Sequence, residues 1–364
     1  MITISKPLIG KEEIKSVKKV LLSGLLAQGA EVKEFEDRFA EYIGVKHAIA
    51  TTNGTTALHL AVLSLGFSPG DEVITTPFSF IASSNCLLYC GLKPVFVDIS
   101  ENDFCIDPDL IEEKITKKTK AILVVHLFGQ VADMSKINKI ARKYKILVIE
   151  DACQAHGATF LEKKAGSLGK VGCFSFYPTK NMTCGEGGMV TTDSDTIDEK
   201  IRMLRTHGQT VRYYHSELGY NYRMTEICAA IGVQQLKKLD AFNTKRQENA
   251  NYLTQNLLGI SGLVCPSQMT GKKHVYHQYT LRVLENFPMS RDLFIEKLNK
   301  ADIGAYVYYP VLISDQEVYK DRGYSETFSI AKKISEQVVS IPVHPGLTKK
   351  ELAYIIKTIK NITQ

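Results

Sequence analysis

One lysine stands where its amine could do covalent chemistry. Lys180 follows the strand-like segment 174–177 and precedes the glycine-rich turn 185–188. Upstream, a β-branched run ends at Asp151. A lysine amine can form a Schiff base with an aldehyde, and an acid can keep a pyridine nitrogen protonated, so that the ring acts as an electron sink. Although a lone loop lysine is usually only solvated, this pair predicts pyridoxal 5′-phosphate (PLP) chemistry.

A third segment could hold the phosphate of such a cofactor. An apolar stretch ends at Asn53, Gly54 permits a tight turn, and the hydroxyl residues Thr55 and Thr56 open a helical run. Free N–H groups and the positive end of the helix dipole meet at such a start and suit an anion. An ordinary helix cap without a ligand explains the same letters, so the turn by itself is a weak signal.

As with this turn, the position of Asp151 can be explained either by a bound ligand or by an ordinary helix cap. An acid that closes a buried parallel strand lies at the carboxyl edge of the sheet, where open α/β folds bind ligands. A hydrogen bond to a charged group is worth about 1.5–3 kcal/mol, which corresponds to about one to two pKa units on a ring nitrogen. The same aspartate could instead cap the next helix.

The elements that must position these groups alternate along the first two-thirds of the chain. Runs of strand length alternate with stretches of helical spacing, which predicts an α/β fold with a mainly parallel sheet. The expected strands are 48–52, 71–75, 94–98, 121–127, 146–149 and 189–192, and the expected helices are 11–22, 32–42, 55–65, 81–89, 134–143, 196–205 and 225–253.

The last hundred or so residues have a different pattern. They predict strands at 278–283 and near 305–308, and helices at 291–300, 329–336 and 349–359. A polar, tyrosine-rich loop is expected at 207–222. We therefore predict a large cofactor-binding domain at 1–245 and a smaller α+β domain at 246–364.

Composition excludes several classes of function. The 364 residues carry a formal charge of +6, but the lysines are scattered and form no basic stripe, so nucleic-acid binding is not expected. The positive balance suits anionic ligands, and solvated surface lysines explain it equally well. No apolar run reaches the length of a membrane helix, and no signal segment opens the chain. The eight cysteines form no CxxC pair, so no metal site is expected, and we predict a cytoplasmic enzyme with reduced thiols.

The chain resembles the DegT/DnrJ/EryC1/StrS sugar aminotransferases, which share the aspartate-aminotransferase-like fold (PLP fold type I). The resemblance runs nearly end to end and is carried by several motifs in the same order. They are Gly54-Thr55-Thr56-Ala57-Leu58, Thr76-Pro77-Phe78-Ser79-Phe80, Glu150-Asp151-Ala152-Cys153-Gln154-Ala155-His156-Gly157, the segment from Ser175 through Lys180 to Gly188, and Gly219-Tyr220-Asn221-Tyr222-Arg223.

This resemblance implies a role for individual residues. Lys180 is similar to the lysine that carries PLP and shuttles the proton, and Asp151 to the partner of the pyridine nitrogen. Phe80 matches the aromatic that stacks on the cofactor ring, and Gln154 a residue near the ring hydroxyl. The phosphate-binding turn is matched by Gly54, Thr55 and Thr56, joined by Ser175. Asn221 is similar to an asparagine that reaches the phosphate from the neighbouring subunit, which implies a homodimer with shared active sites.

The implied reaction moves an amino group from L-glutamate to a nucleotide-diphosphate keto-sugar, in deoxyamino-sugar and surface-polysaccharide (O-antigen) biosynthesis. The turn Gly185-Glu186-Gly187-Gly188 favours a 4-keto-6-deoxy sugar over a 3-keto sugar. Tyr308 and Ser314 stand where many members have histidines, which puts the sugar contacts in doubt.

Other functions remain open at this stage. Some relatives replace the lysine with histidine and act as sugar dehydratases, and a desulfurase-like activity would need Cys184 as its reactive thiol. A non-enzymatic regulator would need a DNA-binding pattern that the sequence lacks. Arg223 could bind a substrate carboxylate or form an ion pair with Glu226. Four histidines are expected to be structural: His156, His207, His274 and His277.

Overall fold

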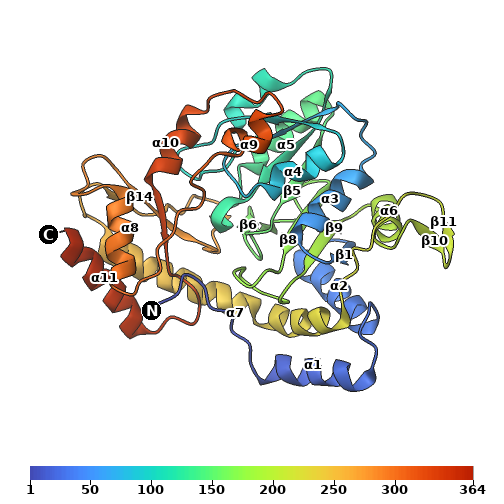
Figure 1. Ribbon diagram of the computed structural model, residues 1–364, viewed down its shortest axis with the longest axis horizontal. Coiled ribbons are helices and arrows are strands. Elements are labelled where there is room, and N and C mark those ends of the chain that lie inside the picture. The colour runs from blue at the N-terminus through green and yellow to red at the C-terminus, as the bar shows by residue number, and fades with distance from the viewer. Residues whose placement is uncertain (364) are drawn as a thin grey trace.

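A seven-stranded sheet forms the centre of the larger part of the molecule (Figure 1). The computed structural model describes residues 1–363. The strand order is β1-β9-β8-β5-β4-β2-β3. The strands are β1 (His47–Thr51), β2 (Glu72–Thr75), β3 (Lys93–Phe96), β4 (Thr119–Val125), β5 (Leu147–Asp151), β8 (Val171–Ser175) and β9 (Gly188–Thr192).

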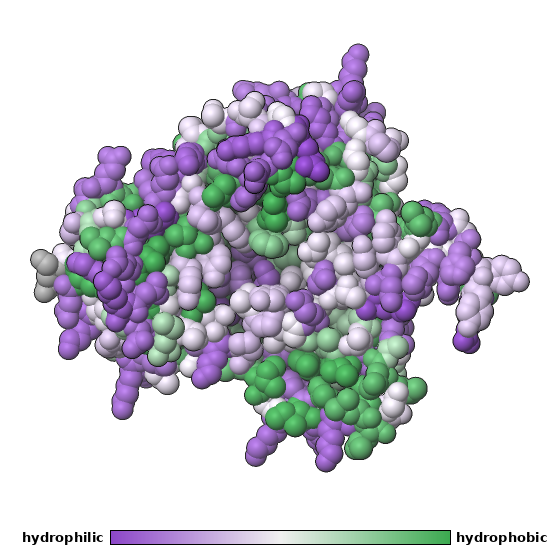
Figure 2. All heavy atoms as spheres, in the orientation of Figure 1, coloured by the Kyte–Doolittle hydropathy of each residue, from purple (hydrophilic) through white to green (hydrophobic). Residues whose placement is uncertain are grey.

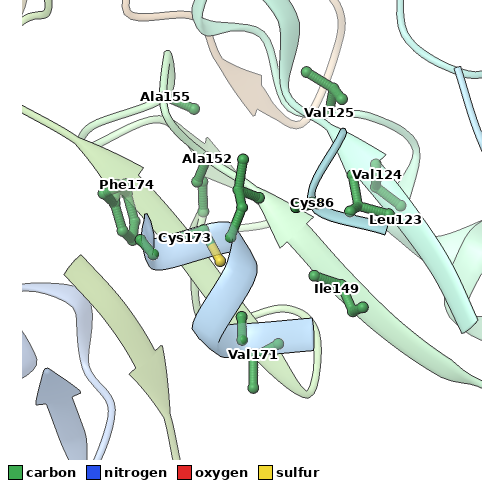
Figure 3. Packing of buried hydrophobic residues seen from close by; sticks show 14 of the residues in the cluster. Cys86, Leu123, Val124, Val125, Ile149, Ala152, Ala155, Val171, Cys173 and Phe174 are labelled. Atoms are coloured by element: carbon green, nitrogen blue, oxygen red, sulfur yellow. The ribbon is translucent and has the colours of Figure 1, made fainter. Parts of the chain in front are cut away.

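Five neighbouring strands, from β8 to β3, run parallel, as the alternating pattern predicts. Only β9 runs against its two neighbours, β1 and β8. Every residue of 121–125 is buried, so both faces of β4 are covered, which is why its sequence is continuously apolar. Figure 3 shows side chains of β4, β5 and β8 packed in one cluster with Cys86, which comes from the helix 82–89.

Helices cover this sheet and connect its strands (Figure 1). Helix α2 buries Phe35 and Phe39, whose rings pack against Phe174 and Phe176 at the end of β8. The helices are α1 (Lys11–Ser23), α2 (Ala30–Ile43), α3 (Gly54–Ser64), α4 (Ala82–Tyr89), α5 (Met134–Tyr144), α6 (Asp195–Arg205) and α7 (Glu226–Leu257), with short 3-10 turns η1 (Pro108–Leu110), η2 (Glu112–Lys114) and η3 (Leu127–Gly129).

A second hydrophobic cluster lies at the other end of α7. Its sheet has the order β12-β14-β15. Helix α7 contributes Val233 and Leu239 to the large cluster and Leu253 and Leu257 to the second one. The elements here are β12 (Leu263–Val264), β14 (Tyr279–Val283), α8 (Arg291–Lys300), β15 (Val338–Ile341) and α11 (Lys349–Thr363). Between α8 and β15 the chain forms η4 (Ile313–Asp315), α9 (Glu317–Lys320) and α10 (Ser329–Gln337), whose buried apolar side chains belong to the large cluster.

Two small sheets complete the structure. One has the order β13-β6-β7, built from β6 (Thr159–Phe160), β7 (Lys163–Lys164) and β13 (Lys272–Lys273). The other is a hairpin of β10 (Gln209–Val211) and β11 (Tyr214–His215), which projects from the body beside α6 (Figure 1). None of the helices within residues 1–363 combines the length and the apolar character that a membrane crossing requires.

The α/β class with a mainly parallel sheet is confirmed. Two local expectations are wrong, and one strand was missed. Residues 305–308 form no strand, and only an isolated bridge joins Tyr306 to Ser340. Strand β15 was not predicted, because its short apolar run directly follows helix α10. The loop 207–222 contains the β10–β11 hairpin. The domain boundary at 245 stays a prediction, and α7 continues unbroken across it.

Candidate active site

A cavity of about 720 Å³ opens at the carboxyl ends of β5 and β8. Both strands end in polar residues, Asp151 and Ser175, and both side chains line the cavity. The ends of parallel strands meet at one edge of a sheet, which is where open α/β folds place their ligands. Most of the predicted site residues line this cavity: Gly54, Thr55, Phe80, Asp151, Gln154, Ser175 and Lys180.

Lys180 reaches the cavity from the loop after β8. Its backbone N–H donates to the carbonyl of Tyr177 at 2.9 Å, which closes a turn. The next residue, Asn181, donates its amide Nδ2 to Asn243 Oδ1 at 2.8 Å and to the carbonyl of Val275 at 2.9 Å. These bonds anchor the loop to α7 and to the segment before β14. The lysine side chain is therefore held over the sheet edge.

The amine of Lys180 sits in surroundings that favour its neutral form. Burial lowers the pKa of Lys180 below the ordinary value for lysine, while the thiol of Cys153 and the carboxylate of Asp151 act in the opposite direction. A charged amine loses hydration when it is buried, whereas a neutral amine loses little. A neutral amine is the form that attacks a carbonyl carbon or accepts a proton.

Asp151 presents a carboxylate whose orientation is fixed by two donors. The Ser83 hydroxyl donates to Oδ2 at 2.7 Å, and the backbone N–H of Cys153 donates to Oδ1 at 3.1 Å. Only 5% of the residue is exposed. The segment that follows forms a turn and not a helix, so the alternative role of Asp151 as a helix cap is wrong. The carboxylate lines the cavity together with Lys180.

The turn at Gly54 starts α3 beside the end of β8. Asn53 caps the helix, because its Oδ1 accepts the N–H of Thr56 at 2.9 Å. A Cβ on Gly54 would lie 2.6 Å from the Cβ of Ser175, so only glycine allows this close approach. Thr55 faces the cavity. The hydroxyl of Thr56 donates to the carbonyl of Asn53 at 2.8 Å, and Thr56 lies outside the lining.

One wall of the cavity is aromatic. Phe80 is 55% exposed, and its ring centroid lies 6.3 Å from that of Tyr309. Gln154 is held at both ends of its amide: Oε1 accepts the N–H of Phe128 at 2.8 Å, and Nε2 donates to the Tyr309 hydroxyl at 3.1 Å. Burial raises the pKa of Tyr309, so this hydroxyl remains protonated and can still donate a hydrogen bond.

Several lining residues were not expected from the sequence. They are contributed by segments distant in sequence, and their letters carry no spacing signal: Ser79, Ser83, His277, Gln278 and Tyr309. Tyr308, which stands where many family members have histidine, also borders the cavity. Of the four histidines expected to be structural, His277 borders the cavity, whereas His156 and His274 are buried outside its lining. Ser314 is buried and does not reach the cavity.

Two expectations concern the segment before α7. Asn221 is exposed and lies outside the lining of this cavity, so its expected role in a neighbouring subunit stays a prediction. The suggested ion pair between Arg223 and Glu226 is wrong. Glu226 begins α7, and its carboxylate accepts backbone N–H groups of Gly29, Glu31 and Val32 at 2.8–2.9 Å, which caps α2.

The donor set fits PLP. The cavity combines an amine with a lowered pKa, an oriented carboxylate, and a helix start where an added Cβ would fill the space between turn and strand. A Schiff-base partner, a partner for a ring nitrogen and an anion cradle are thus present together. A bare metal ion would find a poorer set, because no group of three or more His, Cys, Asp or Glu side chains within residues 1–363 could hold one.

Comparisons with known proteins agree with this chemistry. The model of the DegT/DnrJ/EryC1/StrS aminotransferase family matches residues 7–360. GDP-perosamine synthase of Caulobacter vibrioides is 41% identical and covers 92% of this chain and 90% of its own. UDP-2-acetamido-2-deoxy-3-oxo-D-glucuronate aminotransferase of Pseudomonas aeruginosa is 37% identical over 95% and 94% of the two chains.

Solved structures give the same result. Helicobacter pylori PseC, an aminotransferase involved in the biosynthesis of pseudoaminic acid, superposes with a TM-score of 0.95 at 30% identity, covering 100% of this chain and 99% of that one. Bacillus subtilis NtdA, solved with bound PMP cofactor, gives a TM-score of 0.90 at 33% identity, over 98% and 83% of the two chains. This likeness confirms the aspartate-aminotransferase-like fold class.

Proposed function

The chain belongs to the DegT/DnrJ/EryC1/StrS aminotransferase family, and we propose that it transfers an amino group from L-glutamate to a nucleotide-linked keto-sugar with PLP as cofactor. One observation carries the proposal: the Lys180 amine, whose pKa burial lowers, lines the same cavity as the oriented carboxylate of Asp151. The open turn at Gly54 and Thr55 supplies the third requirement, an anion cradle.

Each residue then has a defined task. PLP, when bound, supplies the electron sink that lets a C–H bond next to nitrogen ionise. Asp151 would hold a proton at the ring nitrogen, and Phe80 would supply the aromatic surface against the ring. Thr55, Ser175 and the N–H groups at the start of α3 bind the phosphate. Lys180 Nζ would hold the aldehyde of the cofactor and, as a free amine, would accept and return the proton of the substrate C–H bond.

Gln154 is proposed to act beside the ring hydroxyl, as the family resemblance implies. Its amide is already fixed by Phe128 and Tyr309, which leaves one Nε2 proton free. A side chain held at both ends does not need to be ordered when the ligand arrives, so its contact costs little conformational entropy. Tyr309 thereby joins the site as the support of Gln154.

The acceptor is proposed to be a nucleotide-diphosphate sugar, with a preference for a 4-keto-6-deoxy sugar. Relatives named for GDP-perosamine and for a UDP-linked 3-oxo sugar support the nucleotide-sugar class and keep the 3-keto alternative open. Tyr308 and Tyr309 add aromatic surface to the cavity, which suits the apolar face of a deoxy sugar. A panel of GDP-, UDP- and dTDP-linked keto-sugars, assayed with glutamate and with product stereochemistry by NMR, distinguishes these substrates.

The active unit is proposed to be a homodimer with shared sites. A patch of apolar side chains at the surface supports this proposal: Ile14, Leu21, Leu22, Leu25 and Leu26 are all more than 40% exposed on and after α1. Figure 2 shows the patch at the lower edge of the molecule, over α1. Large exposed apolar patches mark interaction surfaces. Asn221, exposed outside the cavity of its own chain, is available to a second copy.

Alternative functions find less support. A sugar dehydratase of this family would have histidine in place of Lys180. A desulfurase needs an accessible thiolate, whereas Cys184 is 1% exposed, lies outside the cavity lining, and has a pKa that burial raises well above the ordinary value.

Replacement of the lysine tests the proposal. The purified protein incubated with PLP should be yellow, and Lys180→Ala should lose the absorbance band of lysine-bound cofactor. Transamination should fall by about 100- to 10,000-fold, the range for removal of a general acid–base. Lys170→Ala, which changes an exposed lysine, is the matched control and should keep both. Unchanged turnover in Lys180→Ala would disprove the assignment.

A further inference from the structure

Two buried serines stand behind the Asp151 carboxylate. Ser83 lies in the first turn of α4, and Ser79 lies in the loop before it. The Ser83 hydroxyl donates to Asp151 Oδ2 at 2.7 Å, and the hydroxyls of Ser79 and Ser83 are 2.9 Å apart. An ionised carboxylate can only accept hydrogen bonds. The proton of Ser83 must therefore point at Asp151, which leaves Ser79 as the donor to Ser83.

This gives a chain of hydrogen bonds with one direction, from Ser79 through Ser83 to Asp151. All three residues line the cavity, yet they are only 3%, 1% and 5% exposed. In such surroundings consecutive hydrogen bonds polarise and strengthen one another. The carboxylate is also bonded at its other oxygen by the N–H of Cys153. With a donor on each oxygen, its rotation is restricted.

Resting on the function proposed above, we propose that Ser83, supported by Ser79, is a positioning residue that keeps Asp151 ionised and aimed at the ring nitrogen of the cofactor. A proton shared between a ring nitrogen and a carboxylate lies on the partner with the greater affinity for it. Hydrogen bonds donated to the carboxylate favour its charged form, so the proton stays on nitrogen. Without them the proton moves towards the carboxylate oxygen, and the ring withdraws electrons less strongly.

The same short segment also orients the aromatic wall. The backbone N–H of Ser83 donates to the carbonyl of Phe80 at 3.1 Å, so the turn that places Ser83 behind the carboxylate also holds Phe80 at the cavity. Ser84, the next residue of α4, is fully buried as well. Among the hydrogen bonds of the described residues, none joins Ser84 to Asp151. Ser84 is therefore a matched control, with the same side chain, helix and burial.

The test reads the state of the ring nitrogen directly. The protein and the variants Ser83→Ala, Ser79→Ala and Ser84→Ala are loaded with PLP carrying the heavy nitrogen isotope in its ring, and the nitrogen signal is measured by NMR. Ser83→Ala should move the signal towards the unprotonated position and weaken PLP retention by roughly 10- to 100-fold, since a hydrogen bond to a charge is lost. Ser79→Ala should give a smaller shift in the same direction. Ser84→Ala should leave the signal unchanged.

A signal in Ser83→Ala that matches the unaltered protein overturns the inference, whereas failure of the unaltered protein to bind PLP overturns the proposed function instead. Ser83→Thr keeps the hydroxyl and should restore the protonated signal. If Ser83→Ala does not fold, Ser79→Ala decides: a shift towards the unprotonated position supports the chain of hydrogen bonds, and an unchanged signal contradicts it.

Discussion

Glu150 and Asp151 are adjacent in β5, but their carboxylates belong to two different regions of the molecule. Glu150 is fully buried. Its carboxylate accepts hydrogen bonds from Nε2 of the His126 ring at 2.9 Å and from backbone N–H groups of the loop 166–169 at 2.6–2.8 Å. Asp151 accepts one hydroxyl and one N–H and borders the cavity. Successive side chains of a strand point to opposite faces, so two equal charges one residue apart enter opposite surroundings.

The comparison shows how a structural acid differs from a candidate functional one. Glu150 has its acceptor positions filled by its own chain, so it stabilises a loop and has little capacity for a ligand. Asp151 has enough donors to be oriented and retains lone pairs on its cavity side. Thr55 and Thr56 repeat the contrast at the start of α3, where the first faces the cavity and the second caps the helix.

The largest effect should come from Asp151→Asn. The amide cannot hold a proton on the ring nitrogen, so we expect kcat/KM for transamination to fall by about 100- to 1,000-fold, the range for loss of one preorganised electrostatic group. The melting temperature should change little. Steady-state kinetics and thermal unfolding of the same preparation check both. A near-normal kcat/KM would show that Asp151 is not a functional residue, which contradicts the difference drawn between the two acids.

The converse change is Glu150→Gln. Its amide NH₂ group faces backbone donors of the loop 166–169, so buried N–H groups lose their acceptor. We expect the free energy of unfolding to fall by about 2–4 kcal/mol. Activity per folded molecule should remain within a few-fold of normal. Denaturant titration gives the first value, and active-site titration corrects the second. A stable but inactive Glu150→Gln protein would contradict the division of roles.

Acid should destabilise the protein through buried histidines, of which His156 is one. Burial, followed by the nearby side chains of Lys180 and Arg246, lowers the pKa of His156 to about 3, and the ring packs against Phe174 and Phe176. The unfolded chain binds a proton near the ordinary pKa of about 6.5. The stabilisation is therefore complete above that pH and is lost as the pH falls towards 3, by about 1.4 kcal/mol per pH unit.

The control for this acid effect is His156→Leu. It removes the titrating ring while it keeps an apolar side chain of similar bulk between the two phenylalanines. The unfolding free energy is measured by denaturant titration from pH 7 to 4. In this variant it should fall less steeply with decreasing pH, by about the slope that the uptake of one proton contributes. An identical slope in both proteins would show that His156 does not contribute.

The smallest effects should distinguish the two threonines. Thr55→Val removes a hydroxyl at the cavity and should weaken PLP retention by about tenfold, with little loss of stability. Thr56→Val removes a hydroxyl that bonds the carbonyl of Asn53, so it should lower the unfolding free energy by about 1 kcal/mol and leave PLP retention nearly unchanged. Equilibrium dialysis against PLP and thermal unfolding separate the two. A reversed pattern would place Thr56 at the phosphate.

The sequence predicts those parts of the fold and site whose information is local. Helical spacing and apolar runs predict α3, α4, β4 and β5 closely, since burial sets both patterns. Lys180 and Asp151 are also predictable, because the sequence shows a reactive side chain at or shortly after the end of a buried apolar run. Their common cavity follows from the parallel order of β5 and β8.

The rest depends on contacts between distant segments. Ser83 and Asp151 are separated by 68 residues, and Gln154 and Tyr309 by 155, so no spacing rule predicts either hydrogen bond. Glu226 looks like a helix partner for Arg223 until α2 is placed beside it. The bridge between Tyr306 and Ser340 has the same origin: a strand-like run forms a strand only where a neighbouring strand pairs along its length.

Helix α7 has a consequence for how the protein comes apart. Its 32 residues supply apolar side chains to both hydrophobic clusters. At 1.5 Å per residue the helix is about 48 Å long. If either cluster unfolds, one half of a continuous helix loses its packing partners. That half then lacks the tertiary contacts that give most helices their stability. Heat should therefore unfold both clusters in one cooperative transition, so that probes of the two sheets report the same melting temperature.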